Sequence, residues 1–308
     1  MNILVTGATG FIGKHLVEDL STKNNKIYCF VRDIKKAIPL KKYGVEFLFG
    51  DVTDKASLEQ IKDRNIDIVY HCSGLVESSN IEKLREVNVK GTVNICDMML
   101  ALGIKKMIYV SSVAVITGNP ETPLTDDMPF CSSNIYGQSK LEAEEKVLEY
   151  RKKGLKIGII RPCMIYGADE PHMLGKLVRF AKKRMLPIIG PGENKLHLAY
   201  VKNVTQAMIY MAEKECYEGS FLIADDSVLT VKEVFNIIAQ GANAKEPVQL
   251  PLFITGFLTK IPFIGWKIKF MLKEREYSVE RLKKAGFKWP YDQRQALEES
   301  CKVLAINR

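Results

Sequence analysis

The sequence lacks the cysteine and histidine patterns that build disulfide frameworks or metal sites. Its seven cysteines are scattered and include no CxxC pair, so we interpret them as reduced thiols in a cytoplasmic protein. Its four histidines show no metal-ligand spacing, and we predict that no metal is bound. These absences argue against a disulfide-stapled secreted domain and against a zinc-binding module.

The sequence also has no internal repeat, no low-complexity tract and no long basic run. A net charge of +9 is compatible with an anionic partner such as nucleic acid or a membrane. Because the basic residues are spread along the chain, we instead expect a lysine-rich solvated surface and no nucleic-acid partner. The first residues, MNILVTG, already have a strand pattern, so we expect no signal peptide.

The most apolar part of the second half, residues 251–275, is a poor candidate for a transmembrane helix. It contains Lys260, Lys267 and Lys269 and is broken by Pro262 and Gly265. Two interpretations remain open for residues 252–272: peripheral contact with a membrane, or an apolar lid over a substrate pocket. We favour the lid, because membrane anchoring usually takes two signals.

What the first half of the sequence does contain is an alternation of short apolar segments and helical patterns. This alternation predicts a parallel sheet covered by helices on both faces, an α/β fold of the doubly wound Rossmann type. Ligands bind such sheets beyond the carboxyl ends of the strands. The predicted strands are residues 2–6, 26–31, 46–50, 67–72, 106–112 and 156–161, and helical patterns include residues 11–23, 56–64 and 88–103.

The strand pattern stops shortly after residue 161, and this change suggests a domain division. We predict a dinucleotide-binding Rossmann domain over residues 1–162. Residues 163–308 are then mainly a smaller, interlaced substrate-binding lobe, with a return strand near residues 219–225 that joins the sheet.

The first strand is followed directly by the glycine-rich stretch TGATGFIG, residues 6–13. In a dinucleotide-binding loop, Gly7 makes the tight turn, Gly10 lets the backbone approach a pyrophosphate, and Gly13 lets the helix pack near the sheet. The helix that starts here aims its free N–H groups at the phosphates. We therefore predict cofactor contacts along this loop, including Thr9, Phe11 and Ile12.

The end of the second strand bears on the choice of dinucleotide. Val31 is followed by Arg32, and an arginine at this place suits the 2′-phosphate of NADP. Lys36 can add to the anion site. Asp33 keeps NAD open as an alternative, because a shift of two residues restores a carboxylate contact with the ribose. We predict NADP.

Two further strand ends carry candidate cofactor contacts. Asp51 and Val52 follow the third strand, where Asp51 can accept a hydrogen bond from the adenine amino group. Cys72, Ser73 and Gly74 follow the fourth strand and are small residues of the kind that lets a cofactor lie close to the backbone.

Two tyrosine–lysine pairs have the same spacing: Tyr136 with Lys140, and Tyr210 with Lys214. Ser112, expected at the end of the fifth strand, precedes the first pair, whereas the second lies inside an amphipathic helix pattern. Position relative to the strand ends therefore selects Tyr136 and Lys140 as the catalytic pair.

The chemistry of carbonyl reduction needs these residue types. Hydride transfer to a ketone requires a proton donor at the carbonyl oxygen, and the reverse reaction requires a base. We hypothesise that Tyr136 is this acid and base. Lys140 would lower the pKa of Tyr136 and hold the nicotinamide ribose, and Ser112 would hydrogen-bond the substrate oxygen.

Taken together, the motifs make the chain resemble the extended short-chain dehydrogenase/reductase family. The resemblance covers nearly the whole sequence and is nearer the dihydroflavonol-reductase-like and 3β-hydroxysteroid-dehydrogenase-like branches. The motifs that carry it are TGATGFIG, GDVTD, HCSG, NVKGT, YVSS, YGQSK, RPCMIYG, LAYVKNV, GSFLIADD and SVERLKKAGFKW, in that order.

The resemblance implies further roles. It implies that Asn88 supports a proton relay from Lys140; the alternative is a capping or buried polar residue. It also implies that Pro162, Met164 and Ile165 shape the nicotinamide pocket. The SSVAVITG segment is one residue longer than the family's spacing, so Ser111 is an alternative to Ser112. Finally, it implies a homodimer built on the helices at 88–103 and 135–152.

Two departures from the nucleotide-sugar epimerases of the family narrow the substrate. Those enzymes usually carry an asparagine where Met164 stands and an arginine where Leu196 stands. We therefore predict an NADP-dependent oxidoreductase that interconverts a ketone or aldehyde and an alcohol on a fairly apolar small molecule. The predicted substrate contacts are Ser112, Cys163, Leu196 and His197, although a surface or capping role is open for His197.

Two alternative functions remain open. One is an NAD-dependent nucleotide-sugar epimerase or dehydratase that uses the same tyrosine. The other is a non-catalytic dinucleotide-binding protein on the same fold. The second is ranked last, because the chain keeps its tyrosine–lysine pair.

Overall fold

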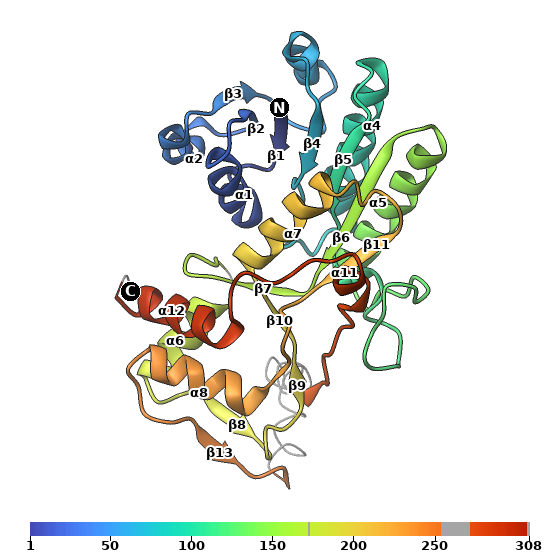
Figure 1. Ribbon diagram of the computed structural model, residues 1–308. Helices are drawn as coiled ribbons and strands as arrows, with labels where there is room; N and C mark the ends of the chain where they lie inside the picture. The colour runs from blue at the N-terminus through green and yellow to red at the C-terminus, as the bar shows by residue number, and fades with distance from the viewer. Residues whose placement is uncertain (172, 254–271, 307–308) are drawn as a thin grey trace. The chain divides into compact units, whose positions relative to one another are not determined.

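A computed structural model describes residues 1–171, 173–253 and 272–306 (Figure 1). The chain divides into two compact units, each built from several segments. The first unit comprises Met1–Pro162, Val204–Ile223 and Val279–Phe287; the second comprises Cys163–Asn203, Ala224–Ser278 and Lys288–Arg308. Most of residues 252–272, considered above as a lid or membrane element, lies outside the described residues.

The first unit is organised by a seven-stranded sheet in the order β11-β6-β5-β4-β1-β2-β3, and every neighbouring pair is parallel. Apart from the edge strand β3, the strands are almost entirely buried, as expected for a sheet covered on both faces. The strand order reverses between β1 and β4, which marks the ligand-binding edge of a doubly wound sheet. The predicted fold class is confirmed. The strands are β1 (Asn2–Thr6), β2 (Lys26–Val31), β3 (Glu46–Phe49), β4 (Ile68–His71), β5 (Lys106–Val110), β6 (Lys156–Pro162) and β11 (Ser220–Ile223).

Helices cover the sheet of the first unit. On one face α4 and α5 pack against each other. Elsewhere Thr205 of α7 donates a hydrogen bond from its hydroxyl to Asp19 of α1, joining those two helices. The helices are α1 (Phe11–Ser21), α2 (Ile34–Ala37), α3 (Ile81–Arg85), α4 (Gly91–Ala101), α5 (Ile135–Lys152), α7 (Val201–Glu213) and α11 (Glu280–Lys284), with a short 3-10 helix η1 (Ile38–Tyr43) after α2.

Three elements of the structure differ in detail from those predicted from the sequence. Residues 56–64 form a 3-10 helix, η2 (Ala56–Arg64), and the 88–103 pattern begins with a π-helical turn, η3 (Glu86–Lys90), before α4. The fifth strand ends at Val110 rather than at Ser112. The chain leaves the sheet early because the Ser112 hydroxyl accepts a hydrogen bond from the Ala114 N–H and so caps the 3-10 turn η4 (Val113–Val115).

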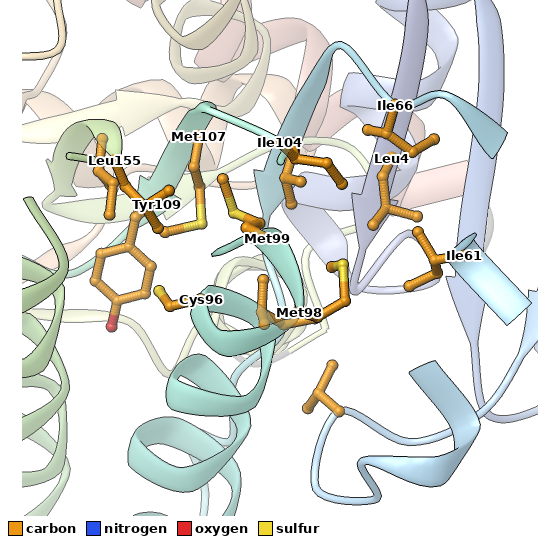
Figure 2. Packing of buried hydrophobic residues seen from close by; sticks show 14 of the residues in the cluster. Leu4, Ile61, Ile66, Cys96, Met98, Met99, Ile104, Met107, Tyr109 and Leu155 are labelled. Atoms are coloured by element: carbon orange, nitrogen blue, oxygen red, sulfur yellow. The ribbon is translucent and has the colours of Figure 1, made fainter. Parts of the chain in front are cut away.

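The apolar core on the α4 and α5 face holds these elements in place (Figure 2). Met98 and Met99 of α4 meet Met107 of β5, Leu4 of β1 and Ile61 of η2 in one cluster. Met99 and Met107 are fully buried. Methionine fills irregular gaps well, so this packing fixes α4 and η2 against the sheet, and with them the loops at the strand ends.

The second unit is smaller, and its described residues form three two-stranded sheets. β7 (Met164–Tyr166) pairs in parallel with β10 (Leu198–Tyr200), and β8 (Pro187–Ile189) pairs in parallel with β13 (Val248–Leu250). β9 (Lys195–Leu196) is antiparallel to β12 (Leu229–Thr230). A second apolar cluster joins three helices to these strands. The helices are α6 (Leu174–Lys182), α8 (Val231–Gly241) and α12 (Gln293–Ile306).

The described residues contain neither a membrane-crossing helix nor a cluster of metal-binding side chains. No helix within residues 1–171, 173–253 and 272–306 combines the length and the apolar character needed to cross a membrane. Within the same ranges, no group of three histidine, cysteine, aspartate or glutamate side chains is arranged to hold a metal ion.

Candidate active site

The glycine-rich turn after β1 is packed backbone to backbone. Gly7 has a φ of +68°, and a Cβ on it would lie 2.6 Å from the carbonyl carbon of Cys72 and the amide nitrogen of Ser73. A Cβ on Gly13 would overlap the carbonyl oxygen of Gly7. Glycine is therefore required at both positions, and together they bring the ends of β1 and β4 against the start of α1.

The N-terminus of α1 is open. Gly10 is the N-cap residue and offers no side-chain hydrogen bond to the first turn. The first N–H groups of a helix have no partner within the helix, and they carry the positive end of its dipole. This end of α1 is therefore suited to a phosphate group.

Most of the predicted cofactor contacts line one hollow in the first unit. The hollow brings together the loops after β1, β2, β3 and β4. Together with the backbone cradle around Gly7 and the open helix end, it fits a dinucleotide. Its lining includes Gly7, Thr9, Gly10, Arg32, Lys36, Asp51, Val52, Cys72, Ser73 and Gly74.

Arg32 and Asp33 have different surroundings. The Arg32 side chain is 68% exposed, and its Nη1 atom lies 3.2 Å from Oδ2 of Asp51. Asp33 accepts hydrogen bonds from the backbone N–H groups of Lys35 and Lys36, so its carboxylate caps α2. Burial raises the pKa of Asp51, but hydrogen bonds from Thr53 and the ion pair with Arg32 outweigh burial and leave the pKa below its usual value. Arg32 is thus an exposed cation beside the hollow, as is Lys36.

A series of buried hydrogen bonds passes through His71, at the end of β4. It was not predicted from the sequence. Nδ1 of His71 lies 2.7 Å from the Thr6 hydroxyl, and Nε2 lies 3.1 Å from the Thr92 hydroxyl. Thr92 donates its proton to the carbonyl oxygen of Asn88 at 2.6 Å. Nε2 must therefore carry the His71 proton, and Nδ1 accepts from Thr6.

His71 is held in its neutral form. Burial, with a smaller contribution from the charge of Lys140, lowers its pKa to about 3. Its position just before the small residues after β4 is the signal that sequence reasoning could have used. Its neutral state could come only from the tertiary structure, because burial causes it.

The predicted catalytic tyrosine lies at the start of α5. Asn134 caps this helix by accepting a hydrogen bond from the Gly137 N–H at 2.8 Å. A Cβ on Gly137 would overlap the carbonyl oxygen of Ala114, so the helix start sits directly against the loop that carries Ser112. The Ser112 side chain hydrogen-bonds to the Tyr136 hydroxyl.

Ser112 and Ser111 are now distinguished by their surroundings. Ser112 is half-buried beside Tyr136, whereas Ser111 is buried and its hydroxyl donates to Glu144 at 2.6 Å. The structure therefore brings Ser112, and not Ser111, to the phenol.

Lys140 is buried one helical turn after Tyr136. Its Nζ atom donates to the carbonyl oxygen of Val110 at 2.7 Å and lies 4.5 Å from the centre of the Tyr109 ring. Burial lowers the pKa of Lys140 to about 8, against the opposing effects of Glu144 and Cys72.

The expectation that Lys140 lowers the pKa of Tyr136 is wrong for this structure. Burial raises the pKa of Tyr136, and the opposing effect is the hydrogen bond from Ser112. The physical reason is that burial, which disfavours the charged phenolate, is the largest effect on the pKa of Tyr136. Tyr136 is therefore a protonated phenol at neutral pH.

Asn88 is fully buried and lies in the π-helical turn. Its Oδ1 atom accepts from the Leu75 N–H at 2.7 Å, and its Nδ2 atom donates to the Leu75 carbonyl and to the Ser139 hydroxyl, each at 2.9 Å. These contacts make Asn88 a buried polar residue that fixes the loop after β4 to α5. It does not cap a helix.

Four predicted contacts flank the end of the sixth strand. Pro162 is the last residue of β6 and pairs with Ile223 of β11. In the second unit, Met164 and Ile165 are half-buried in β7. Cys163 donates to the carbonyl oxygen of His197 at 3.4 Å, and burial raises its thiol pKa well above the ordinary value, so it is unsuited to act as a nucleophile.

Leu196 and His197 both lie in the interior of the second unit. Leu196 pairs with Leu229 within the apolar cluster. His197 is 2% exposed, so the alternative of a surface histidine is wrong, and its contact with a substrate stays a prediction. Its Nδ1 atom accepts from the Tyr277 N–H, and its Nε2 atom donates to the Asp225 carbonyl at 2.7 Å. The ring joins two backbone segments, which the sequence spacing did not indicate.

Comparison with known proteins identifies the family. A model described as the NAD dependent epimerase/dehydratase family matches residues 3–224. The chain belongs to this NAD-dependent epimerase/dehydratase family. The predicted resemblance to the extended short-chain dehydrogenase/reductases is confirmed, and so is the class of NAD(P)-dependent enzyme.

Relatives of this epimerase/dehydratase-family chain have diverse names. It is 28% identical over 265 residues to UDP-glucose 4-epimerase of Vibrio cholerae, covering 82% of this chain and 78% of that protein. It is 28% identical over 255 residues to sterol-4-alpha-carboxylate 3-dehydrogenase, decarboxylating, of Mus musculus, covering 79% and 69%. A crystallised UDP-N-acetylglucosamine 4-epimerase from Methanobrevibacter ruminantium has the same fold, with a TM-score of 0.82 and 22% identity over 100% of this chain and 99% of that chain.

A Gly13→Ala variant of this epimerase/dehydratase-family chain tests whether the close backbone packing of Gly7 and Gly13 is needed for dinucleotide binding. Because the added Cβ meets the Gly7 carbonyl, α1 must shift, and NADPH affinity should fall by at least about tenfold, or about 1.4 kcal/mol. The control is Gly103→Ala, where φ is +72° but no atom lies within 4 Å of the added Cβ. Binding is measured by NADPH fluorescence, and equal affinities in the two variants would contradict the cradle.

His71 gives a prediction for pH. Its pKa is about 3 in the fold, below its ordinary 6.5, so the stability that it contributes is full above pH 6.5 and is lost as the pH falls from there toward 3. As the pH falls through this window, the free energy of unfolding of the unmodified chain should decrease by about 1.4 kcal/mol per pH unit relative to that of His71→Gln. Urea unfolding at several pH values measures the difference.

The comparison also controls for other titrating groups. The buried carboxyl groups of Asp126 and Asp225 have pKa values raised to about 6, so they act in the opposite direction. Both groups are present in the two proteins and cancel in the difference. A difference in stability that does not change with pH would refute a neutral, buried His71.

Proposed function

We propose that the chain is an NADP-dependent oxidoreductase that interconverts a ketone or aldehyde and an alcohol on a fairly apolar small molecule. The observation that carries this proposal is the contact between Ser112 and Tyr136 at the sheet edge that also holds the glycine-rich turn. We assign dinucleotide binding to the first unit and most of the substrate contacts to residues after Pro162.

The raised pKa of Tyr136 suits it to the reduction direction. A protonated phenol can donate to a carbonyl oxygen as negative charge develops there, and the Ser112 hydroxyl can donate a second hydrogen bond to the same oxygen. A bound nicotinamide supplies the hydride in such a reaction. In the reverse direction the resulting phenolate accepts the proton of the alcohol.

Lys140 supports this chemistry as a buried cation. With a pKa of about 8 it is mostly protonated at neutral pH, one turn from Tyr136. We propose that it holds the nicotinamide ribose. A role for Asn88 in a proton relay would need a group that links it to Lys140, because the Asn88 side chain contacts Leu75 and Ser139.

The preference for NADP rests on Arg32. Asp33 is engaged as the cap of α2, whereas Arg32 is exposed at the hollow and is held by Asp51. A guanidinium group at this place can make charge-assisted hydrogen bonds to a 2′-phosphate. Arg32 forms an ion pair with the Asp51 carboxylate, which is also the predicted acceptor for the adenine amino group. The adenine contact of Asp51 therefore depends on the position of the Arg32 side chain.

The substrate class rests on two apolar positions. Met164 and Leu196 stand where the nucleotide-sugar epimerases of the family usually have polar residues, and the Leu196 side chain is buried in an apolar cluster. Relatives named sterol-4-alpha-carboxylate 3-dehydrogenase and 2-alkyl-3-oxoalkanoate reductase support a lipophilic substrate. A relative named UDP-glucose 4-epimerase supports the alternative, an NAD-dependent nucleotide-sugar epimerase or dehydratase.

Tyr136→Phe tests the catalytic assignment. NADPH oxidation is followed with a panel of apolar ketones and aldehydes, and the variant should lose about 10²–10⁴-fold in kcat because the proton donor is gone. The matched control is Tyr210→Phe, the decoy pair's tyrosine, whose hydroxyl donates to the Ala285 carbonyl at 2.7 Å. The control should lose about 1 kcal/mol of stability and keep its turnover.

Two outcomes of this assay would contradict the proposal. If Tyr136→Phe retains most of its turnover, the acid–base assignment is wrong. If the purified protein carries bound NAD, ignores all carbonyl substrates and interconverts UDP-sugars, the epimerase alternative replaces the proposed reduction.

Arg32→Ala tests the dinucleotide preference. Thermal shifts with NADP and NAD give the relative affinities, because a ligand that binds only the folded state raises its melting temperature. Loss of charge-assisted bonds should reduce the NADP-over-NAD preference by about tenfold or more. Lys41→Ala, an exposed cation of η1 outside the hollow lining, is the control. An unchanged preference in Arg32→Ala would refute the assignment.

A further inference from the structure

Glu144 lies at the centre of a buried network next to the catalytic pair. It is on α5, one turn after Lys140, and is 1% exposed. Its Oε2 atom accepts from the Ser111 hydroxyl at 2.6 Å. The Arg161 Nε atom donates to both carboxylate oxygens, at 3.0 and 3.2 Å, and the Arg161 Nη2 atom forms an ion pair with Oε1.

The network continues beyond Arg161. The Arg161 Nη1 atom donates to the carbonyl oxygen of Asp126 at 3.0 Å, and the guanidinium lies 5.3 Å from the centre of the Phe130 ring. The Asp126 carboxylate in turn accepts from the Leu222 N–H of β11. One carboxylate therefore ties α5 to the ends of β5 and β6 and, through Arg161, to the loop at Asp126 and to β11.

These hydrogen bonds hold both elements that carry the proposed catalytic residues, the Ser112 loop and α5. Ser111 is the neighbour of Ser112, so the bond from Ser111 to Glu144 fixes the backbone that presents the Ser112 hydroxyl. Glu144 also shares α5 with Tyr136, eight positions earlier on the same buried face. The Ser112 loop and the Tyr136 helix are thus joined by directional bonds as well as by the close approach at Gly137.

Stability alone is a weak reason for this arrangement. Desolvating a buried ion pair costs much of what the pair gains, and well-packed apolar residues are often as stable. Apolar residues cannot, however, supply bonds of fixed direction to Ser111. The distinctive effect of the carboxylate is therefore geometric.

We propose that Glu144 is a positioning residue, whose Arg161-held carboxylate keeps Ser112 and Tyr136 in contact at the site. This inference rests on the proposed function, because it concerns the alignment of the acid–base pair.

Glu144 has a second effect, on the charge of Lys140. The titratable groups that face Lys140 are His71 and Cys72 at the end of β4, Tyr109 on β5 and Glu144 on its own helix. Burial lowers the pKa of Lys140 to about 8, and Glu144 opposes this effect. Without the Glu144 charge, Lys140 should lose its proton at a lower pH.

Three single variants separate these effects. Glu144→Gln removes the charge but keeps the size, Ser111→Ala removes the bond to the loop without unpairing Arg161, and Glu142→Gln is the control. Glu142 lies on the same helix and pairs with Arg85 at 2.7 Å, outside the network. Folding is checked by thermal unfolding, and NADPH affinity and kcat are measured across pH.

The expected pattern is specific. Glu144→Gln and Ser111→Ala should each lose about tenfold to a hundredfold in kcat, the scale of a misplacement of about 1 Å, while NADPH affinity of the folded protein at neutral pH stays within about twofold. The pH at which NADPH affinity declines should fall in Glu144→Gln but not in Ser111→Ala. Glu142→Gln should match the unmodified chain in all three measurements.

A double variant covers the case in which Glu144→Gln leaves Arg161 unpaired and does not fold. Glu144→Met with Arg161→Met removes both charges together. A folded double variant with lowered kcat supports positioning. A folded double variant with unchanged kcat overturns it, and so do unchanged kcat and an unchanged pH profile in Glu144→Gln.

Failure of the proposed function would be recognised separately. If the unmodified chain reduces no carbonyl compound, the oxidoreductase proposal fails, but the pH dependence of NADPH affinity still reports on Glu144. Under that outcome the positioning role falls with the proposed function, whereas unchanged kcat in Glu144→Gln of a chain that does reduce carbonyl compounds refutes the positioning role alone.

Discussion

The close approach of backbone to backbone at the first turn is the constraint on which the rest of the first unit depends. Gly7 lies against the chain at Cys72 and Ser73, and Gly13 lies against Gly7. No side chain can be placed there, so the ends of β1 and β4 and the start of α1 form one surface. The hollow that fits a dinucleotide exists because these three backbones meet.

A second close approach sets the proposed catalytic residues. Gly137 lets α5 start directly against the Ala114 carbonyl, and this contact brings the helix to the loop that carries Ser112. Close backbone packing at glycine therefore shapes both the dinucleotide site and the proposed acid–base pair. In both cases a glycine removes the side chain that would hold the backbones apart.

Burial explains most of the electrostatics of the site. It makes His71 neutral, keeps Tyr136 protonated and lowers the pKa of Lys140, because each charged form loses its hydration in the interior. The buried carboxylate of Glu144 and the guanidinium of Arg161 compensate each other, as the burial of charge requires. A protonated tyrosine beside a serine is an arrangement suited to giving a proton to a carbonyl oxygen.

Local sequence determined the sheet and the glycine turn, because strand periodicity and turn chemistry act over a few residues, and the choice of Tyr136 over Tyr210 stays a prediction. It also placed the cofactor loops, since parallel strands end on one edge. It did not indicate that the fifth strand stops at Val110, that His71 links Thr6 to Thr92, or that His197 is buried. Nor did it show that the Lys140 ammonium is directed at Val110, or that Glu144 joins Ser111 to Arg161. These features depend on groups that are distant in sequence and on their removal from water, and only the tertiary structure decides both.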